Sequence, residues 1–138
     1  AFVENVDRSK VLTAASIMRK TDVVYEQAGP HQTVRQMRKA GLSTLLVVDN
    51  DRCFKGYVRI DDGIELAKKV PESKDDTAQY TILPVMKTDL YTTTPETPIA
   101  DLVGEASTNV MPFAVLDEGR KLKGIVTRPA ILAGIAGD

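Results

Sequence analysis

The sequence contains few of the residues on which metal and disulfide sites are built. Its 138 residues include one cysteine, Cys53, one histidine, His31, and no tryptophan, and aromatic residues make up 5%. A single cysteine cannot form an internal disulfide, and one histidine and one cysteine give no cluster at metal-ligand spacing. We therefore expect a protein of a reducing compartment, with no metal site and no required cofactor.

Motifs for catalysis are also missing. The sequence has no Walker motif, no Gly-x-Gly-x-x-Gly and no paired-carboxylate arrangement. Cys53 has no histidine nearby to activate it, and His31 has no Ser, Cys or carboxylate placed to form a relay, so we expect His31 to face solvent in the first turn of a helix. The prediction is a protein that is not an enzyme and has no catalytic residues.

No long apolar run is present. The run Leu45-Leu46-Val47-Val48 is far shorter than the ~18 apolar residues that suggest a membrane span. The chain does not open with a signal peptide, and it lacks an initiator methionine, as an excised fragment would. The length suits one domain, which buries roughly 68% of the surface of its unfolded chain. We expect a soluble, cytoplasmic protein.

Charge is distributed unevenly along the chain. Residues 1–70 contain 12 Lys and Arg against 9 Asp and Glu, whereas residues 71–138 contain 6 against 10. The basic first half includes Arg35, Arg38 and Lys39. These side chains have two interpretations: a solvated helix face, or a surface that meets an anionic membrane or an acidic partner.

The sequence repeats itself with a spacing of 68 residues. Residues 13–67 align without gaps on residues 81–135, with nine identities, among them Met18/Met86, Asp49/Asp117 and Gly56/Gly124. Other pairs keep an apolar side chain without keeping its identity, as a buried face requires. Two copies of one supersecondary unit bury their apolar faces against each other, so we expect pseudo-two-fold symmetry and a cleft between them.

Each copy reads as an α/β unit. In the first copy, Thr13 caps a short helix, residues 23–25 form a strand, residues 30–40 form an amphipathic helix between Pro30 and Gly41, and residues 44–49 and 54–59 form a hairpin. Asp62-Gly63-Ile64-Glu65 fits a capping box for a helix that ends near residue 70. The second copy repeats this order, with Ile99, Leu102, Val103 and Ala106 facing inward and Pro129 opening the last helix.

The repeat divides the chain into four parts. Residues 1–10 read as a linker from a preceding domain, 11–70 as the first copy, 71–80 as the linker between copies and 81–138 as the second copy. Apolar helix faces around Met18, Met86, Ile131 and Ile135 predict that a second chain covers them in a homodimer.

Two matching motifs carry a resemblance to a known family. Val48-Asp49 through Gly56-Tyr57-Val58 and Leu116-Asp117 through Gly124-Ile125-Val126-Thr127 each end a hairpin with Asp, a short turn and Gly-hydrophobic-hydrophobic. Such a tandem resembles a pair of CBS domains, the Bateman module, each copy having a small three-stranded sheet of mixed parallel and antiparallel pairing with two packed helices. Residues 2–14 also resemble the junction between the ATPase domain and the CBS pair in glycine betaine/proline ABC importers.

The resemblance implies a regulatory module that binds adenine nucleotides such as AMP, ATP or cyclic di-adenosine monophosphate. In ligand-binding members the motif Gly-hydrophobic-hydrophobic-Thr/Ser-x-x-Asp places a hydroxyl on phosphate and a carboxylate on ribose. This chain departs from the motif in both copies. The first copy keeps the aspartate, Asp62, but has Arg59 in place of the threonine, and the second copy keeps Thr127 but has Ala130 in place of the aspartate.

The candidate ligand residues each have a structural alternative. Asp62 could grip a ribose diol or only cap a helix, and Arg59 could bind phosphate or be an exposed strand-end arginine. Thr127 and Arg128 could hold an anion at a helix N-terminus, although capping explains Thr127 equally well. Tyr25 and Tyr91 could stack on a base, although core packing is the favoured interpretation.

Three functions therefore compete. The first is adenine-nucleotide sensing by a module attached to the ATPase of a compatible-solute importer at the inner face of the membrane, together with the transporter's membrane subunits. The second is sensing of ionic strength or an anionic membrane surface through Arg35, Arg38 and Lys39. The third is a dimerisation scaffold with vestigial sites. None of the three involves nucleic acid.

Overall fold

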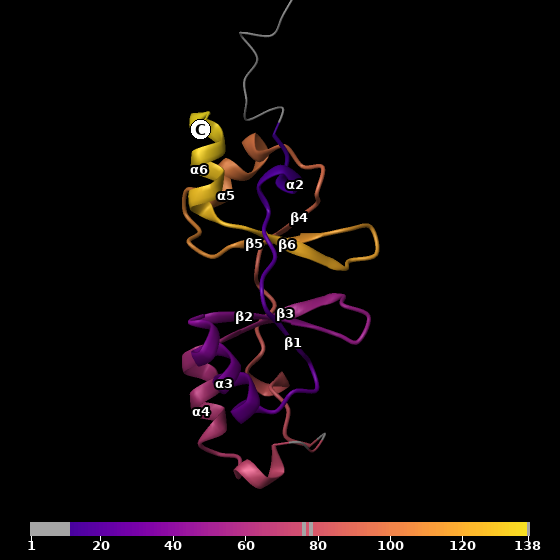
Figure 1. The fold of residues 1–138 in the computed structure, drawn as a ribbon, viewed down its shortest axis with the longest axis vertical. Coiled ribbons are helices and arrows are strands. Elements are labelled where there is room, and N and C mark those ends of the chain that lie inside the picture. Colours follow the sequence, from indigo (N-terminus) through magenta and orange to yellow (C-terminus); the bar gives the residue numbers. More distant parts are fainter. Residues whose placement is uncertain (1–11, 76, 78, 138) are drawn as a thin grey trace, which may run out of the picture. The chain divides into compact units, whose positions relative to one another are not determined.

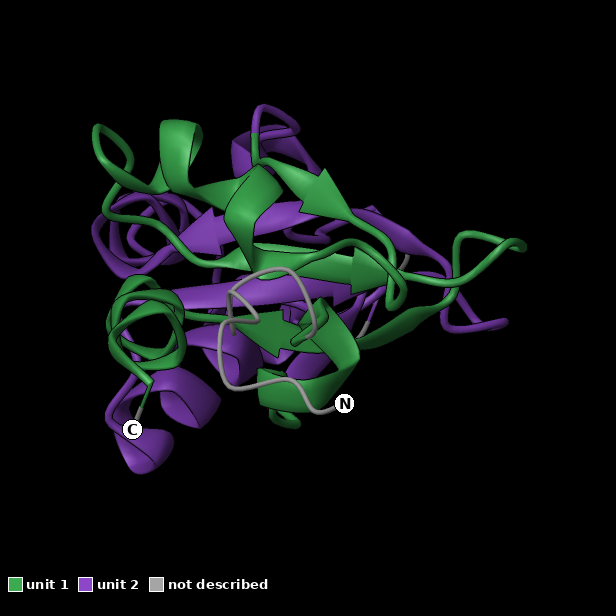
Figure 2. Cartoon of the chain, turned by 90° about the horizontal axis from the view of Figure 1, so that it is seen from above, with its two compact units in different colours: residues 1–21, 90–138 green, residues 22–89 purple. Residues whose placement is uncertain are grey.

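The computed structural model describes residues 12–75, 77 and 79–137. The chain packs into two compact units, coloured separately in Figure 2. One unit consists of residues 22–89, and the other combines the residues up to 21 with those from 90 onward. The predicted linker at residues 1–10 lies outside the described residues, and the sequence boundaries of the two copies stay a prediction.

The unit of residues 22–89 is a three-stranded sheet covered by helices (Figure 1). The strand order is β1-β2-β3, in which β1 runs parallel and β3 antiparallel to the central strand β2. The elements are β1 (Val23–Tyr25), α3 (Pro30–Ala40), β2 (Thr44–Val48), β3 (Phe54–Arg59), α4 (Ile60–Ala67), η1 (Glu72–Lys74) and η2 (Leu83–Val85).

Helix α3 has the predicted boundaries. Pro30 stands at its first position, where the missing N–H costs nothing, and Gly41 ends it in the left-handed conformation with φ of 68°. Val34 and Met37 are buried on one face of the helix. Met37 packs in a core cluster with residues from all three strands and with Ile82.

The other unit repeats this sheet. Strand order is β4-β5-β6, again with one parallel and one antiparallel pair. Its elements are α2 (Ala14–Ile17), β4 (Thr92–Thr93), η3 (Ile99–Leu102), α5 (Val103–Ala106), β5 (Phe113–Leu116), β6 (Leu122–Val126) and α6 (Arg128–Ala136). Its core consists of Ala14, Leu102, Ala106, Phe113, Val115, Val126 and Ile131.

The two hairpins have the same turn. One carboxylate oxygen of Asp49 accepts backbone N–H bonds from Asp51 and Cys53, both at 2.9 Å, and Asp117 accepts the equivalent pair in the second copy. The arginine three residues after each aspartate has a positive φ, 65° in one turn and 63° in the other. The identical Asp and Arg of the repeat therefore build two identical turns.

Each sheet pairs with a segment that belongs to the other copy of the sequence repeat. Arg19 exchanges two backbone hydrogen bonds with Ile125, at 2.9 and 2.8 Å, and Lys87 exchanges two with Tyr57, both at 2.9 Å. Arg19 and Lys87 are equivalent in the repeat, as are Tyr57 and Ile125. The segment that opens the first copy therefore packs with the second copy's strands, and the segment that opens the second copy packs with the first copy's strands.

Several details of the sequence prediction are wrong. Helix α4 begins at Ile60 with Arg59 as its N-cap, so Asp62 lies in the first turn and does not begin a capping box. The second copy divides its first helix into η3 and α5, and Val103 is exposed there because the 3₁₀ turns rotate it away from the core. Ile131, expected on an outer face, is fully buried.

Candidate functional site

The first turn of α4 brings two of the predicted ligand residues together. Strand β3 ends at Arg59, whose extended backbone caps the helix, and Asp62 follows three residues later. Asp61 and Asp62 both lie in this turn, where the partial positive charge of the helix N-terminus favours carboxylates. The Asp62 side chain keeps 39% of its surface exposed, so its carboxylate is open to a ligand.

Lys87 reaches the same turn from a distant part of the sequence. Its ammonium Nζ lies 3.7 Å from Asp62 Oδ2. The backbone of Lys87 makes two hydrogen bonds with the backbone of Tyr57. The residue before Tyr57 in β3 is a glycine, Gly56. A Cβ at Gly56 would overlap the Lys87 carbonyl oxygen, so this glycine permits the approach.

A second polar contact lies beside this ion pair. The Tyr57 hydroxyl donates a hydrogen bond of 2.6 Å to Asp89 Oδ1. This bond and the burial of the ring raise the pKa of Tyr57, and the same bond lowers the pKa of Asp89. Charges on Arg59 and Asp62 also act on Tyr57, and the charge on Lys87 acts on Asp89. The five side chains therefore form one electrostatic cluster at the end of β3.

Thr127 and Arg128 occupy the corresponding place in the other unit. The Thr127 hydroxyl accepts a hydrogen bond of 3.3 Å from the Ala130 backbone N–H, so its capping role is confirmed. Arg128 donates to the Ser107 carbonyl oxygen at 3.4 Å. Anion binding by these two residues stays a prediction.

The two tyrosines proposed as base-stacking residues are exposed. Tyr25 is 44% exposed at the end of β1, and Tyr91 is 47% exposed and stacks on Phe113 with 5.9 Å between ring centroids. The preference for core packing is therefore wrong for Tyr25, whereas Tyr91 is half exposed and still packs on the buried Phe113. Tyr25 lines a groove of about 450 Å³ between β1 and α3, together with Gln27, Gln32 and Asp75 among others.

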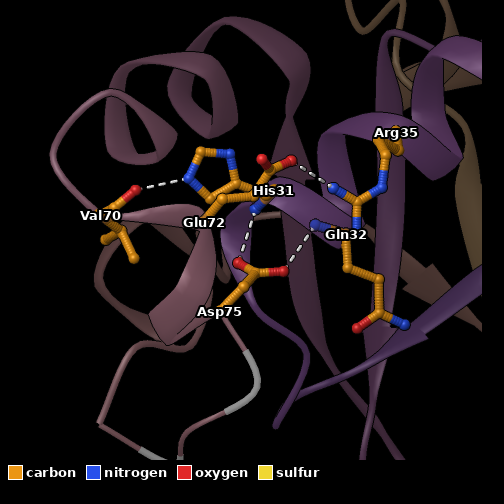
Figure 3. Close-up of polar contacts among 6 residues, drawn as sticks. All are labelled: His31, Gln32, Arg35, Val70, Glu72 and Asp75. Carbon is orange, nitrogen blue, oxygen red and sulfur yellow. Dashed lines mark hydrogen bonds and ion pairs between the residues drawn. The ribbon is translucent and has the colours of Figure 1, made fainter.

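The basic residues of α3 differ in their surroundings. Arg35 forms an exposed ion pair of 3.2 Å with Glu72 (Figure 3), whereas Arg38 and Lys39 lie exposed in the last turn. A groove of about 270 Å³ between α3 and α4 is lined by three apolar side chains, Val34, Ile64 and Ala67. Its other lining residues are His31, Arg35, Arg38, Lys68 and Glu72.

His31 does not face solvent as predicted. Its ring Nε2 bonds the Val70 carbonyl oxygen, which can only accept, so Nε2 carries the hydrogen (Figure 3). The backbone N–H groups of His31 and Gln32 each donate a 2.9 Å bond to the Asp75 carboxylate, which is 4% exposed. Asp75 thus caps α3 across more than 40 residues of sequence, since Gly29 has no side chain to do so.

Within the described part of the chain, no group of three or more His, Cys, Asp or Glu side chains is placed to hold a metal ion. Cys53 lies half-buried beside the β2–β3 turn. Among the same residues, no helix combines the length and the apolar character needed to cross a membrane.

Sequence reasoning missed Lys87, Tyr57, Asp89 and Asp75. Lys87 and Tyr57 are the repeat equivalents of Arg19 and Ile125. The repeat relates the two backbone pairs to each other, but it does not show that either pair forms. Asp75 lies in a polar stretch interpreted as a plain linker, and nothing local distinguishes it from its neighbours.

The architecture and sequence together define a class of protein. A family model described as the CBS domain matches residues 82–137. Three solved structures share the fold: Staphylococcus aureus OpuCA, CBSX2 in complex with AMP, and CbpB in complex with c-di-AMP. Their TM-scores are 0.72, 0.72 and 0.77 at 21%, 19% and 14% identity. They cover 87%, 91% and 92% of this chain, which spans 96%, 96% and 86% of theirs. Residues 82–137 therefore match the CBS domain, and the chain has the fold of a CBS-domain pair.

Two curated relatives match along almost the whole chain. The glycine betaine/carnitine transport ATP-binding protein GbuA of Listeria monocytogenes is 38% identical over 138 residues, and the glycine betaine transport ATP-binding protein OpuAA of Bacillus subtilis is 36% identical over 141. Each alignment covers 99% of this chain, but only 32% and 31% of the relatives. The chain therefore spans about a third of the length of each of these relatives.

Proposed function

We propose that this CBS-domain pair is the regulatory module of a compatible-solute ABC importer ATPase subunit and that it senses an adenine nucleotide. The observation that carries the proposal is the first turn of α4, where a guanidinium and a partly exposed carboxylate stand three residues apart at the end of a strand. The relatives named for glycine betaine transport and the folds solved with AMP and c-di-AMP support it.

The chemistry of this turn suits a nucleotide. A carboxylate accepts hydrogen bonds from the two hydroxyls of a ribose diol, and bonds to a charged acceptor are stronger than neutral ones. The planar guanidinium of Arg59 offers donors that match phosphate oxygens. Asp62 is therefore proposed to bind the ribose and Arg59 the phosphate, in place of the threonine hydroxyl that this copy lacks.

The proposed role is regulatory and not catalytic. A ligand shifts a conformational equilibrium only by the difference in its affinity for the two states. The nucleotide would therefore act by favouring one arrangement of the module over another, and the attached ATPase would respond to that arrangement. This role places the protein in the cytoplasm, at the inner face of the membrane that holds the importer's membrane subunits.

A homodimer belongs to the same proposal. Leu132 and Ile135 of α6 and Val103 of α5 are exposed, at 54%, 38% and 36%. These apolar side chains replace the buried Ile131 as the surface on which a second chain would pack. Sedimentation should give twice the 15.1 kDa of one chain, and Leu132→Glu should shift it to the monomer.

A thermal-shift titration tests nucleotide sensing. A ligand that binds only the folded state stabilises it by about 2.7 kcal/mol at a hundredfold excess over its Kd. AMP, ATP and c-di-AMP should be titrated against the wild type, Asp62→Ala and Asp61→Ala, the last being an exposed carboxylate of the same turn as a matched control. We expect a shift with at least one nucleotide that Asp62→Ala removes and Asp61→Ala keeps. No shift at millimolar ligand would exclude the proposal.

A second candidate function rests on a different observation. Arg38 and Lys39 are exposed in the last turn of α3, next to the apolar groove between α3 and α4. Such a surface would attract anionic lipid and release it as salt screens the charges, because the Debye length falls from about 10 Å at 0.1 M to about 3 Å at 1 M. Vesicles with anionic lipid should bind the wild type in a salt-dependent manner, and Arg38→Gln with Lys39→Gln should weaken this binding. Equal binding by the double variant would exclude this function.

A further inference from the structure

The cluster at the end of β3 contains equal numbers of cationic side chains and carboxylates. It contains two cations, Arg59 and Lys87, and two carboxylates, Asp62 and Asp89. Asp89 is engaged by the Tyr57 hydroxyl at 2.6 Å, while Asp62 faces the Lys87 ammonium at 3.7 Å. Without Lys87, the cluster would carry one carboxylate more than its cations, and it would repel a phosphate.

Lys87 combines a backbone held by hydrogen bonds with a partly exposed charge. Two hydrogen bonds to Tyr57 hold its main chain, while half of its side-chain surface is exposed. A partly exposed ion pair contributes little to stability, so little is lost when the ammonium leaves Asp62. The four-carbon stem of lysine lets the ammonium turn to a new partner within its reach.

This arrangement is confined to the unit of residues 22–89. The positions equivalent to Tyr57, Arg59, Asp62 and Asp89 are occupied in the repeat by Ile125, Thr127, Ala130 and Thr21. Lys87 alone has a charged equivalent, Arg19, and its backbone makes the same pair of bonds. The other unit therefore keeps the backbone contact but has no carboxylate at the positions equivalent to Asp62 and Asp89.

We propose that Lys87 is a specificity-determining residue that exchanges its partner when a nucleotide binds. The hydroxyls of the ribose replace the ammonium at Asp62, and the ammonium then pairs with the phosphate alongside Arg59. After the exchange the Asp62 carboxylate accepts hydrogen bonds from the ribose hydroxyls, and the negative charge of the phosphate is paired with the two cations. The site consequently favours phosphorylated ligands over nucleosides. This inference rests on the proposed nucleotide site at the first turn of α4.

Calorimetric titration of the whole chain with AMP and with adenosine tests the inference. The variants are Lys87→Gln, Lys87→Arg and, as matched control, Lys68→Gln, which removes an exposed lysine that pairs with Glu65 at 3.3 Å on the surface of the same unit. Loss of one charge-assisted bond should weaken AMP binding by Lys87→Gln roughly tenfold or more. Adenosine binding should change less than about twofold, Lys87→Arg should retain AMP binding, and Lys68→Gln should behave as the wild type.

The outcomes separate this inference from the proposed function. If the wild type binds AMP and Lys87→Gln binds it equally well, the role of Lys87 is wrong while nucleotide sensing stands. If Lys87→Gln weakens AMP and adenosine equally, Lys87 only supports the fold and the selectivity is refuted. If the wild type binds neither compound, the proposed site fails and the inference fails with it.

Discussion

Gly56 and Gly124, which are 68 residues apart, lie against the backbones of Lys87 and Arg19, which are also 68 residues apart. A Cβ at Gly124 would come within 2.7 Å of the Arg19 carbonyl oxygen, and a Cβ at Gly56 would overlap that of Lys87. Neither glycine has a positive φ. Both are therefore required by the close approach of the exchanged segment and not by their own backbone angles.

Alanine at either glycine should separate that segment from the sheet. We expect Gly124→Ala and Gly56→Ala each to lower the free energy of unfolding by about 1–3 kcal/mol, as overpacking in a core does. Gly104→Ala is the control, because nothing lies within 4 Å of a Cβ there and alanine favours the helix. Urea denaturation measures all three. Equal stability of the Gly124→Ala and Gly104→Ala variants would contradict the explanation.

A charge in α2 should destabilise the unit that contains residues 90–138. Ala14 is fully buried in its core, whereas the adjacent Ala15 is exposed. Burying an unpaired carboxylate at Ala14→Glu should cost about 3 kcal/mol or more, while Ala15→Glu should change stability by less than about 0.5 kcal/mol. Near-identical denaturation midpoints for the two variants would show that α2 is not part of that core.

The cap that Asp75 provides for α3 should be measurable. Asp75→Ala removes the acceptor for two backbone N–H groups and should cost about 1–2 kcal/mol. Asp75→Asn keeps one oxygen acceptor and should lose less. The control is Glu72→Gln, which weakens only the exposed ion pair with Arg35 and should change stability by less than about 1 kcal/mol. A larger loss for Glu72→Gln than for Asp75→Ala would refute the cap.

The bond between Tyr57 and Asp89 should make stability depend on pH at both extremes. The pKa of Tyr57 is raised in the folded protein. Its contribution to the free energy of unfolding is therefore present below about pH 10 and is lost as pH rises through the folded-state pKa. The pKa of Asp89 is lowered in the folded protein. Its contribution to the free energy of unfolding is therefore present above about pH 4 and is lost as pH falls through the folded-state pKa.

The stability difference between the wild type and Tyr57→Phe should therefore be largest near neutral pH and shrink toward both extremes. Denaturation midpoints across the pH range measure it. Tyr91→Phe is the control, because the ring of Tyr91 is exposed and stacks on Phe113. A difference that is independent of pH would mean that the hydroxyl acts only through packing.

The sequence repeat predicted the parts of the fold that local rules determine. The two hairpins follow from Asp and Arg at fixed positions in each turn, and α3 follows from Pro30 and Gly41 at its ends. Arg59 and Asp62 were found because they occupy motif positions three residues apart, and three residues bring them into one helical turn.

Long-range contacts were not predictable in the same way. The cap on α3 comes from Asp75, and Lys87 reaches Asp62 only because its segment joins β3 in the folded chain. Val103 was misplaced because a 3.6-residue period was assumed where η3 has a tighter turn. Ile131 and Ile135 share one face of α6, yet Ile131 is buried and Ile135 is exposed. A helical period gives the direction of a side chain but not how far along the helix the core extends.

Helix α2 packs in the unit that contains residues 90–138, and this determines which part of the molecule a force applied at the N-terminal side acts on first. Any domain joined ahead of residue 12 is the sequence neighbour of the first copy, but its connection is anchored through Ala14 and Arg19 to residues 90–138. A displacement arriving from that side is therefore transmitted first to the second copy. The first element to take up the load is therefore α2, which packs with residues 90–138 and not with the strands of residues 22–89 that follow it in the sequence.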